Sequence, residues 1–277
     1  MRLFAGDRVL ALDAPVVMGV LNVTPDSFSD GGLHADPGAA IAAGLRMLEQ
    51  GAAILDVGGE STRPGAAQVS IDEELRRVLP VVHGLVRAGA CVSIDTRKPE
   101  VMRACIDLGV HGVNDVSALR APGAIEAVAS SRVAVFLMHM QGEPGTMQQA
   151  PRYQNVLDEV STFLRERVQA CEAAGIVRER LVIDPGFGFG KTLEHNLVLL
   201  RGLSDFQVLG LPLLAGLSRK SMLQTLTGRV AGERLAGSLA LALAAVAGGA
   251  RIIRAHDVAE TVDALKVWAA VRGEQAR

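Results

Sequence analysis

The chain has 277 residues, of which 49% are hydrophobic and 21% charged, and its formal net charge at pH 7 is −2. Its Lys and Arg residues form no block, so the composition excludes the clustered basic face that nucleic-acid binding requires. Because one α/β barrel takes about 250 residues, we expect a single domain over residues 1–277.

The N-terminal segment MRLFAGDRVL has no long apolar core and carries Asp7 and Arg8, so we do not expect a signal peptide. The longest uncharged stretch, Leu235 to Ala250, is shorter than the ~20 residues of a membrane helix. The cysteines are odd in number and lack CxxC spacing, which favours reduced thiols over disulfides or a zinc knuckle. These features predict a cytoplasmic protein that does not bind a membrane.

Eight short apolar runs follow one another along the chain, and helical patterns separate them. The runs cover residues 16–22, 54–59, 92–95, 112–116, 133–139, 181–185, 211–218 and 252–257. Most are too short for helices and show no polar alternation. This pattern is typical of parallel strands that are buried on both faces.

The intervening segments carry helix signals. Asp36 followed by Pro37 is a good N-cap with a first-turn proline. Asp257, three residues before Glu260, predicts a capping-box-like start of the last helix. Strand and helix alternating eight times predict a closed (β/α)₈ barrel of the TIM type. An open doubly wound sheet is the alternative, although no GxGxxG follows the first run.

Polar side chains stand at the end of nearly every run. They are Asn22, Glu60, Asp95, Asn114, His139, Asp184, Ser218 and Arg254. Each alone is explained as well by a helix cap or a turn. In a barrel, however, all these ends meet at the rim that holds the active site. Arg254 and His256, two residues apart, should also point the same way.

Three loops on this rim stand out. The segment PGFGFGK after Asp184 could let the backbone approach a ligand closely, although a plain turn into a helix near Thr192 explains it equally well. Residues 24–32 and 59–70 are long and rich in Gly, Pro and Ser, as binding loops often are.

The chain has no HExxH or His-x-His motif, so we expect no dedicated transition-metal site. Ser218 lacks a GxSxG elbow, so we do not interpret it as a hydrolase nucleophile.

Long strings in these runs resemble the signature blocks of the dihydropteroate synthases. They include MGVLNVTPDSFSDGG from Met18, ILDVGGESTRPGA from Ile54, SIDTRKPEV from Ser93, LVIDPGFGFGKTLEHN from Leu181 and IIRAHDV from Ile252. The blocks follow the family order and cover nearly the whole chain. Arg97 is one departure, because the family pattern suggests a smaller residue there. Since Arg97 should alternate away from Asp95, we expect little effect.

The resemblance implies a transferase of folate biosynthesis and a sulfonamide target. In that reaction 6-hydroxymethyl-7,8-dihydropterin diphosphate loses diphosphate in an SN1-like step, and the amine of p-aminobenzoate attacks the exocyclic methylene to give 7,8-dihydropteroate. It also implies Mg²⁺ as cofactor, small-molecule substrates and a homodimer. The helix expected over residues 235–247 is apolar all round, which favours such a dimer interface unless the chain itself covers the helix.

The resemblance also implies roles for individual residues. The pterin would be bound by Asp95, Asn114, Met138, Asp184 and Lys220. The diphosphate would be bound by Asn22, Arg63, Arg254 and His256, with the Asn22 carbonyl also on Mg²⁺. The p-aminobenzoate pocket would comprise Phe28, Thr62, Arg63, Pro64, Phe189, Lys220 and Ser221. The catalytic groups would be Asp95, Lys220, Arg63 and Arg254. The chemistry suits these roles, since carboxylates accept from pterin N–H groups and arginine forks match phosphate.

Two other functions stay open. A pterin-binding barrel that carries methyltetrahydrofolate would share the pterin-binding Asp and Asn residues, but it would not need the STRPG loop or the Arg254–His256 pair. A non-catalytic pterin-binding paralogue should have lost at least one of Asn22, Arg63, Lys220 and Arg254, and all four are present. We therefore favour an active synthase.

Overall fold

The structure, a computed structural model, describes residues 1–24, 36–61, 68–143 and 145–273. Eight parallel strands form one sheet in the order β8-β7-β6-β5-β4-β3-β10-β9. Their bounds are β3 (Val16–Asn22), β4 (Ile54–Gly58), β5 (Val92–Asp95), β6 (Gly112–Asp115), β7 (Ala134–Met138), β8 (Leu181–Asp184), β9 (Leu214–Ala215) and β10 (Ile252–Ala255). A parallel bridge between Ile183 and Leu213 joins the two ends of this sheet. The predicted barrel is confirmed, because a doubly wound sheet would reverse its strand order.

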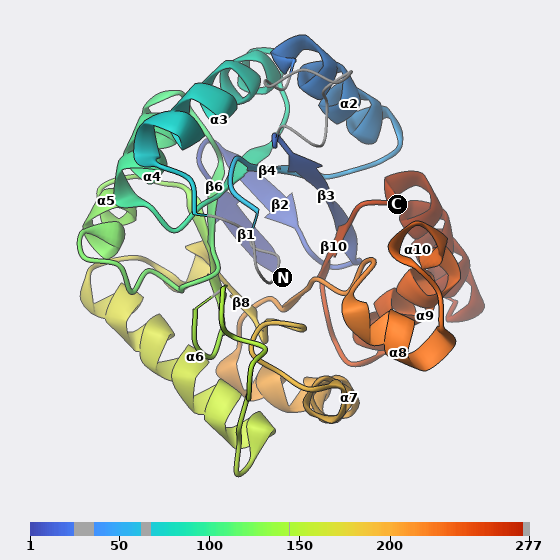
Figure 1. Cartoon of the computed structure of the whole chain (residues 1–277). Helices are drawn as coiled ribbons and strands as arrows, with labels where there is room; N and C mark the ends of the chain where they lie inside the picture. Colours follow the sequence, from blue (N-terminus) through green and yellow to red (C-terminus); the bar gives the residue numbers. More distant parts are fainter. Residues whose placement is uncertain (25–35, 62–67, 144, 274–277) are drawn as a thin grey trace.

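Helices surround the ring of strands (Figure 1). Their bounds are α2 (Pro37–Glu49), α3 (Ile71–Arg87), α4 (Pro99–Asp107), α5 (Ala124–Ala129), α6 (Val156–Ala173), α7 (Leu193–Arg201), α8 (Ser221–Thr227), α9 (Leu235–Ala247) and α10 (Val258–Val271). Short 3₁₀ helices cover Arg178–Arg180, Leu203–Leu209 and Ala231–Glu233. The unit between β9 and β10 thus holds two α-helices, where one was predicted.

The helix caps were predicted with mixed success. Asp36 caps α2 by accepting from two backbone N–H groups of the first turn, and Thr192 caps α7. The capping box expected at Asp257 is wrong, because its side chain makes no cap hydrogen bond to α10. The carboxylate binds the Arg219 guanidinium instead. This charge-assisted pair across two connecting loops competes with the weaker local cap.

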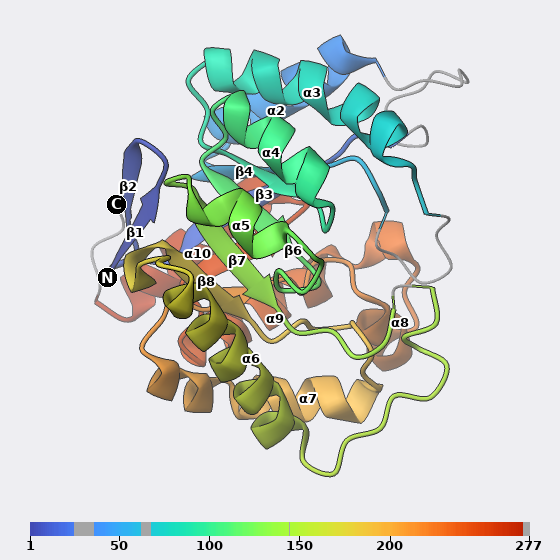
Figure 2. The same ribbon diagram turned by 90° about the vertical axis from the view of Figure 1, so that its left-hand side faces the viewer.

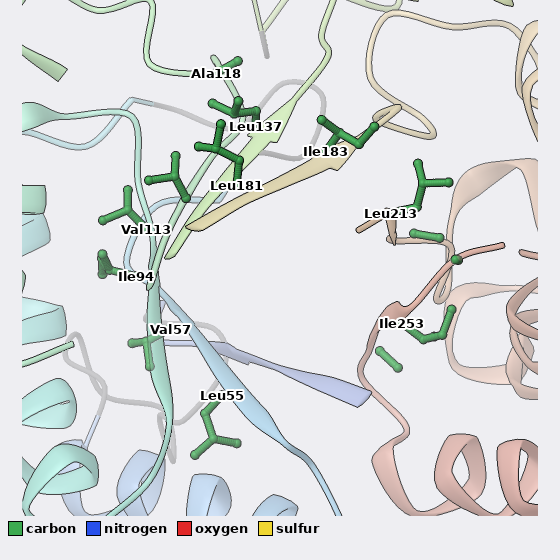
Figure 3. Close-up of a cluster of buried hydrophobic side chains, with 14 of the residues drawn as sticks. Leu55, Val57, Ile94, Val113, Ala118, Leu137, Leu181, Ile183, Leu213 and Ile253 are labelled. Atoms are coloured by element: carbon green, nitrogen blue, oxygen red, sulfur yellow. The ribbon is translucent and has the colours of Figure 1, made fainter. Parts of the chain in front are cut away.

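The strands alternate between two environments. Leu55 and Val57 on β4 belong to the apolar layer that packs beneath the helices (Figure 3). Asp56 lies between them and reaches across the ring to side chains of β5, β6 and β10. Outward positions therefore build the main hydrophobic core, and inward positions fill the barrel.

A hairpin that was not predicted closes the amino end of the barrel. Strands β1 (Arg2–Ala5) and β2 (Arg8–Ala11) pair antiparallel around a turn in which Gly6 has φ 67°. Figure 2 shows the hairpin at one end of the barrel. Leu3 and Ala5 pack there against inward side chains at the start of the strands. Four-residue strands are too short for a periodicity argument, and the exposed Phe4 hides the alternation of buried and exposed residues in β1.

In the described part of the chain, no helix is long and apolar enough to cross a membrane. The three cysteines, Cys91, Cys105 and Cys171, are free and buried.

Candidate active site

Asp56 is the centre of a buried polar network inside the barrel. Its Oδ1 accepts from Ser93 Oγ at 2.6 Å, and its Oδ2 accepts from Asn114 Nδ2 at 2.9 Å and Arg254 Nε at 2.7 Å. The side chain is wholly inaccessible to solvent. Sequence reasoning missed Asp56, although a carboxylate within a buried apolar strand demands partners and was therefore a signal.

Arg254 joins this network to Asp95. Its Nη2 donates to Asp95 Oδ2 at 2.7 Å, so one guanidinium spans two carboxylates. Burial raises the pKa of Asp95 to about 7, against the opposing charge of Arg254. Burial disfavours the charge of Arg254 as well, yet Asp56 and Asp95 together raise its pKa above the ordinary value. The role assigned to Arg254 on diphosphate stays a prediction.

Asp184 ends β8 and is 5% exposed. Its Oδ1 accepts from the Gly186 backbone N–H at 2.7 Å, which fixes the orientation of the carboxylate. Burial raises the pKa of Asp184 to about 6, while that hydrogen bond and the charge of Lys220 lower it. Strand order places Asp95, Asn114 and Asp184 on the inner wall of β5, β6 and β8. The three carboxylate and amide groups predicted for the pterin therefore share one mouth of the barrel.

The glycines after Asp184 lie where the chain is tightly packed, and a close approach of this backbone to a ligand stays a prediction. Gly186, Gly188 and Gly190 all have positive φ. A Cβ on Gly186 or Gly190 would clash with the backbone carbonyl oxygens of His139 and Gln141, respectively. Gly186 and Gly190 are therefore needed because the segment packs against the chain that follows β7.

Lys220 and Phe189 meet beside this segment. The Lys220 Nζ lies 4.1 Å from the centroid of the Phe189 ring, a cation–π geometry. Burial lowers the pKa of Lys220 to about 8, and the charge of Arg254 adds to this shift. Arg219, with φ 56°, turns the backbone just before Lys220. Ser221 follows as the first residue of α8 and is exposed.

An apolar wall lies next to these polar groups. Met138, the last residue of β7, packs in a small buried cluster against which Phe189 also leans. The other members of the cluster are Val116, Met140 and Met147. Thioether side chains adapt their shape, so this wall suits the face of a flat ring.

Asn22 and His256 lie at the rim. A Cβ on Gly58 would lie 3.6 Å from Asn22 Oδ1 and 3.7 Å from Asp95 Oδ2, so two oxygens flank one space. His256 follows β10, and its Nδ1 lies 3.0 Å from Ser218 Oγ. Arg254 and His256, two residues apart, bind different side chains. Arg254 turns onto the inner carboxylates, whereas His256 meets Ser218 at the rim.

Several predicted groups cannot be placed. Phe28, Thr62, Arg63 and Pro64 lie outside the described residues. Arg97 is described, and its guanidinium pairs with Glu60 at 3.5 Å and Glu143 at 3.0 Å. Within the ranges that the structure covers, no cluster of three or more His, Cys, Asp or Glu side chains could hold a metal ion.

Comparison with known proteins gives a consistent result. The family described as pterin binding enzyme matches residues 18–256. The chain is 53% identical over 268 residues to the dihydropteroate synthase of Escherichia coli (strain K12), covering 96% of this chain and 95% of that one.

Solved structures are similar over nearly their full length. The dihydropteroate synthase of Yersinia pestis with a sulfonamide drug has a TM-score of 0.94 at 48% identity, covering 99% of this chain and 100% of that one. The Xanthomonas albilineans enzyme with 4-aminobenzoic acid has a TM-score of 0.91 at 55% identity, covering 98% of both chains. The same enzyme with 7,8-dihydropteroate has a TM-score of 0.91 at 52% identity, covering 99% of this chain and 100% of that one.

Proposed function

The chain belongs to the pterin-binding enzymes, and from its likeness to the dihydropteroate synthases over nearly its whole length we infer its reaction. It condenses 6-hydroxymethyl-7,8-dihydropterin diphosphate with p-aminobenzoate to give 7,8-dihydropteroate and diphosphate. The bond from the exocyclic methylene carbon to the diphosphate oxygen breaks, a carbon–nitrogen bond forms, and the arylamine loses one proton. The chain is thus a transferase of folate biosynthesis and a sulfonamide target.

The observation that carries this function is the group of buried carboxylates and amide at one barrel mouth. We propose that Asp184, held by Gly186, accepts N–H groups from the amino-pyrimidine edge of the pterin. Asn114 Nδ2 donates one N–H to Asp56, which leaves its second N–H and its carbonyl oxygen for the substrate. Met138 would lie against the ring face.

Asp95 is suited to stabilise the positive charge that develops on the pterin methylene. A carboxylate held by Arg254 and shielded from water acts more strongly than one in bulk solvent. The same shielding would protect an SN1-like cation from water. Arg254 therefore has two tasks in this proposal, because it orients Asp95 and carries positive charge towards the leaving diphosphate. Lys220, next to both charged groups, would complete the catalytic set with Arg63.

Mg²⁺ fits this site as an ion that arrives with the diphosphate. Such an ion needs few protein ligands, and these are oxygens. Asn22 Oδ1, which faces the same space as Asp95 Oδ2, would bind the ion. Arg63 and His256 would bind the diphosphate that the ion accompanies. When bound, Mg²⁺ neutralises charge on the leaving group.

The p-aminobenzoate pocket is proposed beside Lys220, with Phe189 as one wall and Ser221 at the start of α8. Phe28, Thr62, Arg63 and Pro64 would complete it. An ammonium group close to an aromatic ring suits an arylcarboxylate, because the cation pairs with the carboxylate and the ring stacks on the substrate.

We also propose a homodimer in the cytoplasm. Ser238, Leu241, Ala242 and Ala245 of α9 are buried by the chain itself. An alanine stripe of Ala236, Ala240, Ala244 and Ala247 remains exposed on another face. A partner that covers this stripe would remove apolar surface from water. Light scattering at micromolar concentration should give a dimer mass, and a monomer mass would overturn this proposal.

The reaction itself is tested by incubating the protein with the pterin diphosphate, p-aminobenzoate and Mg²⁺ and detecting dihydropteroate by mass. We expect stoichiometric dihydropteroate and diphosphate. Asp184→Asn is the matched control, because it keeps the size of the side chain but turns a donor towards the pterin N–H groups. Folded wild-type protein that binds pterin without forming product would favour the non-catalytic paralogue. Transfer of a methyl group from methyltetrahydrofolate would favour the other pterin-binding barrel.

A further inference from the structure

Lys191 is buried at the end of the glycine-rich segment 186–190, with 3% of its surface exposed. Its Nζ lies 2.9 Å from His139 Nδ1, 2.9 Å from the Gly186 carbonyl oxygen and 3.1 Å from the Phe189 carbonyl oxygen. The His139 carbonyl oxygen lies further away, at 3.4 Å, so these acceptors satisfy all three donors of an ammonium group. The proposed reaction gives Lys191 no task of its own.

His139 is suited to accept this hydrogen bond. Burial lowers the pKa of His139 to about 2, so its ring is neutral and one ring nitrogen is an acceptor. The ring also packs edge-on against Phe163, with centroids 4.9 Å apart. The ammonium group therefore binds to a fixed point on the chain that follows β7.

Burying an ammonium group costs free energy, which indicates that Lys191 has a role beyond filling space. Burial lowers the pKa of Lys191 to about 7, and the charge of Asp184 offsets this only in part. Two other contacts hold the segment without a charge. Tyr153 Oη donates to the Gly190 carbonyl at 2.9 Å, and Asn196 Oδ1 accepts from the Gly188 N–H at 2.7 Å. Lys191 differs from these because it draws two carbonyls of the segment, including that of Phe189, to one point.

We propose that Lys191 is a positioning residue for p-aminobenzoate, because it fixes the backbone of Phe189 and so holds that ring beside Lys220. The proposal rests on the proposed function. It assigns Lys191 an effect on the second substrate and little effect on the first. Asp184 keeps its own hydrogen bond from the Gly186 N–H, so Lys191 acts on the pterin side only through its charge and makes no hydrogen bond to that carboxylate.

The test is a double-mutant cycle with Lys191→Met, Phe189→Ala and the double variant, read by steady-state kinetics. We expect Lys191→Met to raise the KM for p-aminobenzoate at least about tenfold and to change pterin affinity less than about threefold. In the Phe189→Ala background, Lys191→Met should add less than about twofold, because it acts through Phe189. Tyr153→Phe is the matched control. It removes an uncharged contact to the same segment and should leave this KM within about twofold.

Other outcomes overturn the proposal. Additive effects in the cycle, or equal losses of affinity for both substrates, would mean that Lys191 only stabilises the fold. If Lys191→Met does not fold, Lys191→Gln enters the same cycle, and failure of both variants to fold would show a purely structural role. A wild-type protein that makes no dihydropteroate would instead refute the proposed function, so the two failures are distinguishable.

Discussion

The two halves of the barrel interior differ sharply, although the same strands build both. Near the amino ends, the inward side chains are apolar, as at Ile54 on β4 and Ile252 on β10. Two residues further along, the inward positions hold Asp56 and Arg254, which pair at 2.7 Å. A step of two residues keeps the side chain on the same face of a strand. The fold thus separates stability from chemistry along the barrel axis.

The half near the amino ends of the strands, here called the lower half, is stabilised by apolar packing, which needs no charged or hydrogen-bonding partner. The half that contains Asp56 and Arg254 is called the upper half. Phe136 is 1% exposed, and a Cβ on Gly112 would lie 2.9 Å from its ring. Hairpin residues Leu3 and Ala5 close this layer from below. In the upper half the buried polar groups depend on charged or hydrogen-bonding neighbours, so single substitutions of these groups should alter binding as well as stability.

The largest effect should come from removing the centre of the upper network. Asp56→Ala leaves buried donors of Asn114 and Arg254 without their acceptor, so the free energy of unfolding should fall by about 3–5 kcal/mol. Pterin affinity should fall too, since Asn114 and Asp95 lose their fixed orientation. Urea denaturation and calorimetric titration measure the two effects. Unchanged pterin affinity in the folded variant would show that Asp56 serves the fold alone.

A comparable change in the lower half should affect only stability. Phe136→Ala creates a cavity, so the free energy of unfolding should fall by about 3 kcal/mol. Both KM values, measured well below the unfolding transition, should stay within about twofold of wild type. A clear rise in either KM would contradict the separation of the two halves.

Pterin binding should depend on pH, because its proposed acceptor Asp184 is an ionisable group of the upper half. Because the pKa of Asp184 is raised to about 6, affinity for the pterin should fall as the pH drops through 6, by about tenfold per unit below it. Stability should move the other way. A folded-state pKa above the unfolded value means that protonating Asp184 between pH 6 and about 4 favours the folded state. Titrations from pH 5 to 8 test this, and Asp184→Asn should abolish the acid-side loss.

The smallest effect is expected at the rim. The Arg219 side chain is 42% exposed, so its pair with Asp257 is screened by solvent. Arg219→Ala should lower the free energy of unfolding by less than about 1 kcal/mol. Thermal unfolding measures this loss, with Arg201→Ala, at another exposed pair, as the control. A loss as large as that of Asp56→Ala would show that the rim shares the energetics of the interior.

The sequence predicted the strands well because burial on both faces leaves a continuous apolar run, as at residues 16–22. It predicted Asp95, Asn114 and Asp184 as rim groups because barrel strands end at one mouth. It missed Asp56, whose partners are 37 to 198 residues away in the sequence, and it misassigned Asp257, whose partner Arg219 is 38 residues away. Local patterns cannot show a partner that only the closed ring provides.

The pairing of Arg254 with Asp56 also has a consequence for folding during synthesis. The two residues are 198 positions apart in sequence, and Arg254 lies on the last strand of the ring. On the ribosome, β3 to β8 can pair one after another while Asp56 and Asp95 still lack their cation. Contacts between such distant positions form slowly, because a long loop must close first. Binding competence should therefore appear as the final event of biogenesis, when β10 enters between β3 and β9.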